Sequence, residues 1–254
     1  MYAVEEGPLD PVVCPSCRFN LEQITGNPLH VLNTNNYQYI TDQIKAKIMA
    51  GCQNENCTCM DLAVIIDSSQ STSAHGFERM KLEAIALVQT MIFGQNNVRV
   101  SFVVFAKTAY KVADYSRFAT FEDYKNTLMS IQYEPEITNT AAAFQQVVTW
   151  TPQWRPKVPS VIYFFSSGKH DGTTANPVPV ADTLRAEGAQ IVSIAVPDYA
   201  GVIEPENIPE LTSICGCTVG SACPNLFQVP NIDQLPAFTD KIVAQTICSK
   251  NPCP

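Results

Sequence analysis

The sequence lacks a long apolar run, a basic cluster and the glycine motifs of nucleotide-binding proteins. No stretch of about 18 apolar residues occurs, so we expect no membrane-spanning helix. The net charge is −8 and lysine and arginine do not cluster, which argues against non-specific binding to nucleic acid or anionic membranes. No G-x-G-x-x-G follows the first apolar segment and no P-loop lysine is present, so nucleotide binding has little support.

Histidine is also scarce, with His30, His75 and His170 alone. None of them stands in a recognisable Ser/His/Asp arrangement. A hydrolase built on Ser69 and His75 would need a sharp G-x-S-x-G turn, and that motif is missing. The sequence therefore predicts a protein that is not an enzyme.

Cysteine is absent from residues 60–214 and gathers on either side of that stretch. The ten cysteines are Cys14, Cys17, Cys52, Cys57, Cys59, Cys215, Cys217, Cys223, Cys248 and Cys253. An even number grouped at two ends predicts disulfides and a secreted, extracellular protein, although spacing does not reveal the pairing. Met1–Asp10 has no apolar signal-peptide core, so we expect the signal to have been removed.

Two other uses of these cysteines are open. Cys14-Pro-Ser-Cys17 has the spacing of half a zinc site, but a second C-x-x-C pair is missing. A redox role for the same pair would need a strand before it and a helix after it. One glycosylation sequon, Asn56-Cys57-Thr58, has a cysteine at its centre, which makes its use doubtful.

The remaining sequence is that of a globular protein, with 46% apolar and 16% charged residues over 254 positions. Apolar segments of strand and helix type alternate from residue 61 onward. Expected strands are 62–66, 98–105, 108–113, 160–165, 190–196 and 226–229. Expected helices are 76–93, 121–131, 140–150, 177–187, 206–214 and 232–247. This alternation predicts an α/β fold with a doubly wound, mostly parallel sheet and helices on both faces.

The chain is expected to have three parts. Residues 1–59 form a cysteine-rich N-terminal extension with a helix at about 37–49. Residues 60–248 form the α/β domain, and residues 249–254 form a C-terminal tail. In a doubly wound sheet, ligands bind beyond the carboxyl ends of strands where the strand order reverses. The segments after residues 66 and 165 are therefore the ones to inspect.

Asp67–Ser71, with the sequence Asp-Ser-Ser-Gln-Ser, directly follows the first apolar strand. A carboxylate and two hydroxyls at alternate positions of one loop can direct oxygen ligands at a single point. Oxygen ligands suit a hard divalent cation such as Mg²⁺. The alternative is structural, because Asp67 can cap the following turn and the hydroxyls can satisfy backbone amides without a metal.

Asp67–Ser71, the later Thr138-Asn-Thr and Ser166-Ser-Gly together resemble a von Willebrand factor A domain, over about residues 60–248. The resemblance implies a metal-ion-dependent adhesion site, with Ser69, Ser71 and Thr138 as direct ligands and Asp67 acting through water. Such sites usually have an aspartate where this chain has Ser167. One negative charge then replaces two, so binding of Mg²⁺ or Mn²⁺ is expected to be weak. Asp171, four residues on, is a further candidate carboxylate.

A narrower resemblance is to the A domains of secreted nematode proteins that often carry a C-type lectin domain. It rests on residues 177–188 and on Cys215-Gly-Cys217. The family resemblance implies a secreted, non-enzymatic binding or adhesion module whose partner is an extracellular protein or matrix ligand. If a metal binds, an acidic side chain of the partner completes its shell. The alternative is a structural matrix subunit that self-associates through its cysteine-rich ends without metal.

Overall fold

The computed structural model describes residues 57–249 and 251–254, which belong to one compact unit. The expected helix at 37–49, the sequon residue Asn56, and Cys14, Cys17 and Cys52 lie outside the described residues. No helix within the described residues is both long and apolar enough to cross a membrane.

A six-stranded sheet forms the centre of the unit, in the order β3-β2-β1-β4-β5-β6. All neighbouring strands are parallel except β2 and β3, which are antiparallel. The strands are β1 (Met60–Asp67), β2 (Val98–Phe105), β3 (Ala109–Ala113), β4 (Ser160–Ser166), β5 (Gln190–Ala195) and β6 (Leu226–Gln228). The chain builds outward from β1 in one direction and then from β4 in the other. The predicted doubly wound topology is confirmed, and its switch point lies between β1 and β4.

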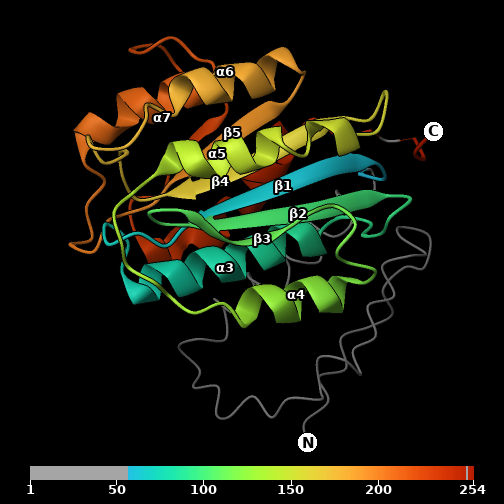
Figure 1. The fold of residues 1–254 in the computed structure, drawn as a ribbon, viewed down its shortest axis with the longest axis horizontal. Coiled ribbons are helices and arrows are strands. Elements are labelled where there is room, and N and C mark those ends of the chain that lie inside the picture. The colour runs from blue at the N-terminus through green and yellow to red at the C-terminus, as the bar shows by residue number, and fades with distance from the viewer. Residues whose placement is uncertain (1–56, 250) are drawn as a thin grey trace, which may run out of the picture. The chain divides into compact units, whose positions relative to one another are not determined.

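Helices cover both faces of this sheet (Figure 1). On one face lie α3 (Ala74–Gln89), α4 (Phe121–Met129) and α8 (Thr239–Gln245). On the other lie α5 (Thr140–Val148), α6 (Val178–Ala186) and α7 (Ile208–Ile214). Short 3-10 turns complete the unit: η1 (Thr151–Gln153), η2 (Pro205–Asn207) and η3 (Ile232–Phe238).

Strand β1 shows why the sheet is covered twice. Its side chains alternate between the two faces, so Leu62, Val64 and Ile66 enter one core cluster. Ala63 and Ile65 enter the other. All five are completely buried. A strand that is apolar on both faces is typical of a parallel sheet between two helix layers.

The expected closing helix at 232–247 is wrong as a single element. The segment forms the 3-10 turn η3, which contains Pro236, and only then the helix α8. Proline has no backbone N–H and its ring clashes with the preceding turn of an α-helix. The expected helix at 206–214 likewise begins with the 3-10 turn η2 and becomes α-helical at Ile208.

Three disulfides connect described cysteines. Cys57 pairs with Cys248 and Cys59 with Cys253, so the two ends of the unit are joined twice. Cys217 pairs with Cys223 inside one late loop. The prediction that the cysteines form disulfides is confirmed for these six. The expectation that every cysteine forms a disulfide is wrong for Cys215, which is free and buried. Its thiol donates a hydrogen bond to the Asn225 carbonyl at 3.2 Å.

Helix α4 is capped by a hydroxyl whose removal is expected to be measurable. The Thr120 Oγ1 accepts the Asp123 N–H at 3.2 Å, and Thr120 has the extended backbone of an N-cap. Thr120→Ala is expected to lower the free energy of unfolding by about 1 kcal/mol. Urea denaturation checks this. Thr127→Ala, the same change inside the same helix, is the matched control and should cost nothing, since alanine favours helix.

Candidate functional site

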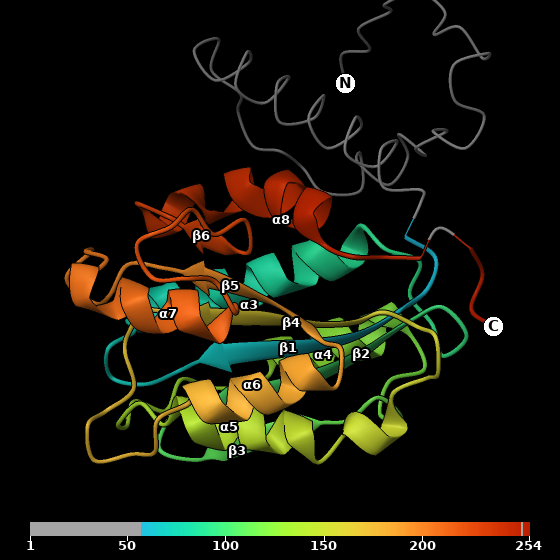
Figure 2. The same cartoon turned by 90° about the horizontal axis from the view of Figure 1, so that it is seen from above.

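The residues singled out in the sequence meet at the carboxyl ends of β1 and β4. Asp67 is the last residue of β1, and Ser69 and Ser71 lie in the loop that leads to α3. Thr138 lies just before α5, and Ser167 follows the end of β4. In Figure 2 this edge of the sheet lies at the tip of the β1 arrow, opposite the C-terminus. The structure brings these loops together at one edge of the sheet.

The hydroxyl groups of Ser69, Ser71 and Thr138 form one hydrogen-bonded cluster. Ser69 Oγ lies 2.8 Å from Ser71 Oγ, and Thr138 Oγ1 donates to Ser69 Oγ at 2.8 Å. Ser71 Oγ and Thr138 Oγ1 are 3.5 Å apart. Three oxygens from two loops are thus within hydrogen-bonding distance of one another.

Ser167 and Thr72 extend this cluster. Ser167 Oγ lies 3.1 Å from Ser71 Oγ and 2.6 Å from Thr72 Oγ1. Thr72 and Ser167 are both buried. Thr72 was missed in the sequence, although a hydroxyl residue directly after Ser71 was a visible signal. We call the hydroxyls of Ser69, Ser71, Thr72, Thr138 and Ser167 the hydroxyl cluster.

Asp67 supplies the carboxylate beneath the hydroxyl cluster and is completely buried. One carboxylate oxygen accepts the Ser69 N–H at 2.8 Å, and the other accepts the Ser166 hydroxyl at 2.8 Å. Burial raises the pKa of Asp67 above its usual value, and the hydrogen bonds from Ser69 and Ser166 oppose that rise. Asp67 therefore acts as the structural anchor of the loop that carries the two serines.

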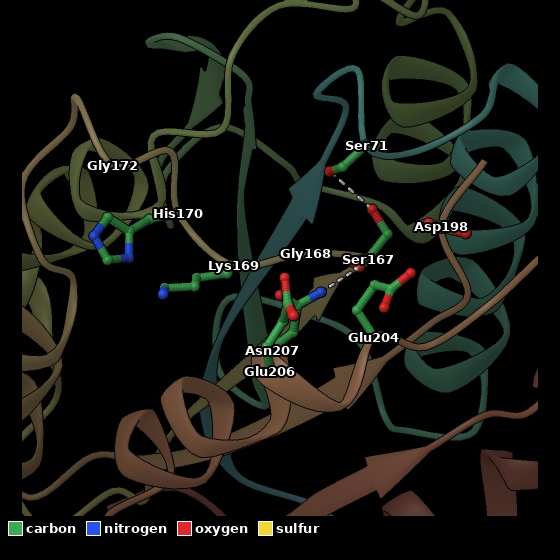
Figure 3. Close-up of a pocket in the computed structure, with 10 residues that line it drawn as sticks. All are labelled: Ser71, Ser167, Gly168, Lys169, His170, Gly172, Asp198, Glu204, Glu206 and Asn207. Atoms are coloured by element: carbon green, nitrogen blue, oxygen red, sulfur yellow. Dashed lines mark hydrogen bonds between the residues drawn. The ribbon is translucent and has the colours of Figure 1, made fainter. Parts of the chain in front are cut away.

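An open pocket of about 400 Å³ lies beside the hydroxyl cluster. Figure 3 shows Ser71 and Asn207 joined to Ser167 by hydrogen bonds. Asn207 Nδ2 donates to the Ser167 carbonyl at 3.4 Å. Other lining residues are Lys169, His170, Asp198, Glu204 and Glu206. The pocket thus offers hydroxyl, amide and charged groups of both signs.

Two further candidate site residues, Asp171 and His75, lie outside the hydroxyl cluster. Asp171 does not line the pocket, and its carboxylate accepts the N–H and the hydroxyl of Thr173 in its own turn. These hydrogen bonds lower the pKa of Asp171. His75 Nε2 lies 3.0 Å from the Asp233 carboxylate in an exposed pair. Neither residue adds a charge to the hydroxyl cluster.

The donor set does not fit a tightly held divalent cation. The three predicted hydroxyl ligands, Ser69, Ser71 and Thr138, are neutral and already hydrogen-bond to one another. The one predicted carboxylate, Asp67, already accepts hydrogen bonds from Ser69 and Ser166. No group of three or more His, Cys, Asp or Glu in the part of the chain described here could hold a metal. Mg²⁺ releases its waters reluctantly and requires charged ligands to bind well. Metal ligation by Ser69, Ser71, Thr138 and, through water, Asp67 stays a prediction.

A doubly wound sheet whose switch point carries an Asp-x-Ser-x-Ser loop and a threonine from a second loop is the arrangement expected of an A domain. The family model of the von Willebrand factor type A domain matches residues 61–241. The chain belongs to this family, as the sequence resemblance predicted. The narrower resemblance to nematode A domains stays a prediction.

Relatives with this fold occur in the extracellular matrix. The human collagen alpha-6(VI) chain is 25% identical over 234 residues, which cover 90% of this chain and 10% of that relative. Mouse matrilin-4 is 26% identical over 144 residues, covering 54% of this chain and 23% of the relative. The chain spans less than a quarter of the length of these curated relatives.

A solved structure of proximal thread matrix protein 1 from the mussel byssus superposes with a TM-score of 0.64 at 21% identity. The match covers 74% of this chain and 45% of that chain. That protein was solved with zinc in its metal-ion-dependent adhesion motif. At this level of identity the likeness establishes the fold that the two chains share.

Proposed function

We propose that this protein is an extracellular, non-enzymatic module that binds an extracellular protein or matrix ligand. Membership of the von Willebrand factor A family and the matrix relatives support this proposal. The disulfides between the two ends of the unit support a secreted location. The non-enzymatic assignment is supported by His75, which pairs with Asp233 rather than with a serine.

The observation that carries the proposal is an exposed aromatic residue, Tyr199, on a loop that contributes Asp198 to the pocket. Tyr199 is 73% exposed and follows the pocket residue Asp198. Its N–H donates to the Ser71 carbonyl at 2.9 Å, which ties its loop to the hydroxyl cluster. Asp198 Oδ1 accepts the N–H groups of Ala200 and Val202 at 2.8 and 3.0 Å. The loop is therefore held in place before any partner arrives, which reduces the entropy cost of binding.

Tyr199→Ala is expected to weaken partner binding about 30-fold or more, because an aromatic side chain that anchors an interface contributes about 2 kcal/mol or more. The protein is used to recover partners from extracellular material, and the affinity for each recovered partner is measured by surface plasmon resonance. Val219→Ala is the matched control, since Val219 is an exposed apolar residue in the Cys217–Cys223 loop. Equal affinity of both variants would place the binding surface elsewhere.

A divalent cation has a minor part in this proposal. Mg²⁺ or Mn²⁺ held through Ser69, Ser71 and Thr138 would be weakly bound, because Asp67 is the one carboxylate among the predicted ligands and Asp171 is bonded within its own turn. An acidic side chain of the partner would complete the shell of such a cation. The binding face itself is built from side chains and backbone groups of this chain, so the proposed module does not require the metal.

The second candidate function is a structural matrix subunit that self-associates through its cysteine-rich ends. The matrix relatives favour it. However, Cys57, Cys59, Cys248 and Cys253 pair with one another within the chain. Covalent self-assembly would thus depend on Cys14, Cys17 or Cys52, since the thiol of Cys215 is buried. Multimers that disappear on reduction in a non-reducing gel would favour this candidate, and a single monomer band would oppose it.

A further inference from the structure

One residue, Ser167, accounts for much of the poor fit between the hydroxyl cluster and a divalent cation. Ser167 stands where sites of this family usually have an aspartate, and its hydroxyl bonds to Ser71 and Thr72. We infer that Ser167 makes this binding face independent of divalent cations, because its hydroxyl completes a cluster that holds the loops in place without metal. The inference deepens the proposed function and rests on it for the identity of the binding face.

The hydroxyl cluster joins three separate loops. Ser69, Ser71 and Thr72 belong to the loop between β1 and α3. Thr138 belongs to the segment between α4 and α5, and Ser167 to the segment between β4 and α6. Each of the two later loops is thus hydrogen-bonded to the first by side-chain hydroxyls.

Backbone hydrogen bonds reinforce the same three loops. The Gln70 N–H donates to the Glu136 carbonyl at 2.8 Å, and the Asp171 N–H donates to the Thr138 carbonyl at 2.8 Å. Gly168 packs closely against Ser71, since a Cβ added to it would lie 3.0 Å from Ser71 Oγ. The arrangement of the loops is therefore supported by groups that carry no charge and need no ion.

Electrostatics also disfavours a cation here. Serine and threonine hydroxyls are neutral, so Asp67 is the one formal charge directly bonded to the loop of the cluster among the described residues. A cation that displaced the cluster's hydrogen bonds would find one carboxylate bonded to that loop, Asp67, whose two oxygens already accept hydrogen bonds from Ser69 and Ser166. Affinity of oxygen sites for hard cations rises with the number of charged ligands. Restoring one carboxylate at position 167 is accordingly the smallest change that could create metal dependence.

The test is a comparison of thermal unfolding in millimolar Mn²⁺ or Mg²⁺ and in EDTA, on the full chain. We expect the Tm of the unmodified protein to change by no more than about 2 °C, the shift expected when the cation does not exceed its Kd. Ser167→Asp is expected to gain a cation-dependent rise of about 5–10 °C once the cation reaches about 100 times its Kd. Isothermal titration with Mn²⁺ gives the binding isotherm directly.

Two matched variants complete the experiment. Ser221→Asp adds the same charge at an exposed position in the Cys217–Cys223 loop and should show no cation response. Ser167→Ala removes the hydroxyl without adding charge and should also show none. A saturable Mn²⁺ isotherm of the unmodified protein that Ser69→Ala abolishes would overturn the inference, even if Ser167→Asp does not fold. Partner recovery that is equal with and without EDTA supports it, whereas loss of recovery for Tyr199→Ala tests the binding role separately.

Discussion

Replacing Asp61 with alanine is expected to lower the free energy of unfolding by about 3–5 kcal/mol, because the change leaves buried positive charge without its partner. Asp61 is completely buried at the start of β1. Its carboxylate accepts two hydrogen bonds from the Arg99 guanidinium, both at 2.9 Å. It also accepts the Arg155 Nε at 2.9 Å and the Arg155 backbone N–H at 2.7 Å.

Arg155 connects Asp61 to neighbouring segments, so the loss of stability on removing Asp61 is expected to extend to them. Its guanidinium also donates to the carbonyls of Met60 at 2.9 Å and Asn97 at 2.6 Å, which lie at the starts of β1 and β2. The side chains of Arg99 and Arg155 are only 15% and 19% exposed, so water does not readily replace the lost carboxylate. The substitution is thus expected to weaken the end of the sheet opposite the hydroxyl cluster.

Urea denaturation followed by circular dichroism measures this loss. Asp233→Ala is the matched control, because Asp233 pairs with His75 and Arg79 on the surface and is 63% exposed. Surface ion pairs contribute about 0–1 kcal/mol, so the control should change stability little. A loss of less than about 1 kcal/mol for Asp61→Ala would show that the two arginines find other partners.

Removing both disulfides that join the ends of the unit is expected to cost far more than removing either one. Cys57–Cys248 closes a loop of 191 residues, and Cys59–Cys253 closes one of 194. Because the two bonds lie side by side, either one keeps the long loop closed, and the second then closes only a short ring. On the chain-entropy model, each single removal costs about 2 kcal/mol and removal of both about 8 kcal/mol.

The measurement is a double-mutant cycle of Cys57→Ser/Cys248→Ser, Cys59→Ser/Cys253→Ser and the combination of the two. The free energy of unfolding is taken from denaturation without reductant. The Cys217→Ser/Cys223→Ser variant is the control, since that bond closes a loop of six residues and its loss should resemble a single removal. If the loss of stability in the combined variant equalled the sum of the two single losses, the explanation that either disulfide keeps the long loop closed would be wrong.

Much of the fold follows from local sequence pattern. The apolar residues of β1 and β4 face helices on both sides, so continuous apolar runs separated by amphipathic segments are sufficient to indicate a doubly wound sheet. The meeting of Asp67 and Ser167 also follows, because carboxyl ends of adjacent parallel strands share one edge. The break at Pro236 could have been anticipated from its missing N–H, but the expected helix ignored it.

Other features depend on contacts between distant residues. The pairing of Cys57 with Cys248 rather than with another cysteine depends on where the ends of the sheet lie. Cys215 is free because its side chain faces into the unit and bonds to Asn225, which its spacing from Cys217 does not reveal. Thr72 joins the hydroxyl cluster because the loop turns back toward β4, 95 positions later in the chain.

The sequence by itself determined the family, the doubly wound sheet and the five hydroxyl and carboxylate residues at its switch point, because these depend on periodicity and on residues next to strand ends. The tertiary structure alone decided which hydrogen-bond partners those hydroxyls and that carboxylate have. In the folded chain the hydroxyls of Ser69, Ser71, Thr138 and Ser167 satisfy one another, and Asp67 is turned beneath them toward Ser69 and Ser166. Hydrogen-bond partners across loops are set by three-dimensional packing, and the motif alone does not distinguish a cation's ligands from a self-contained hydroxyl cluster.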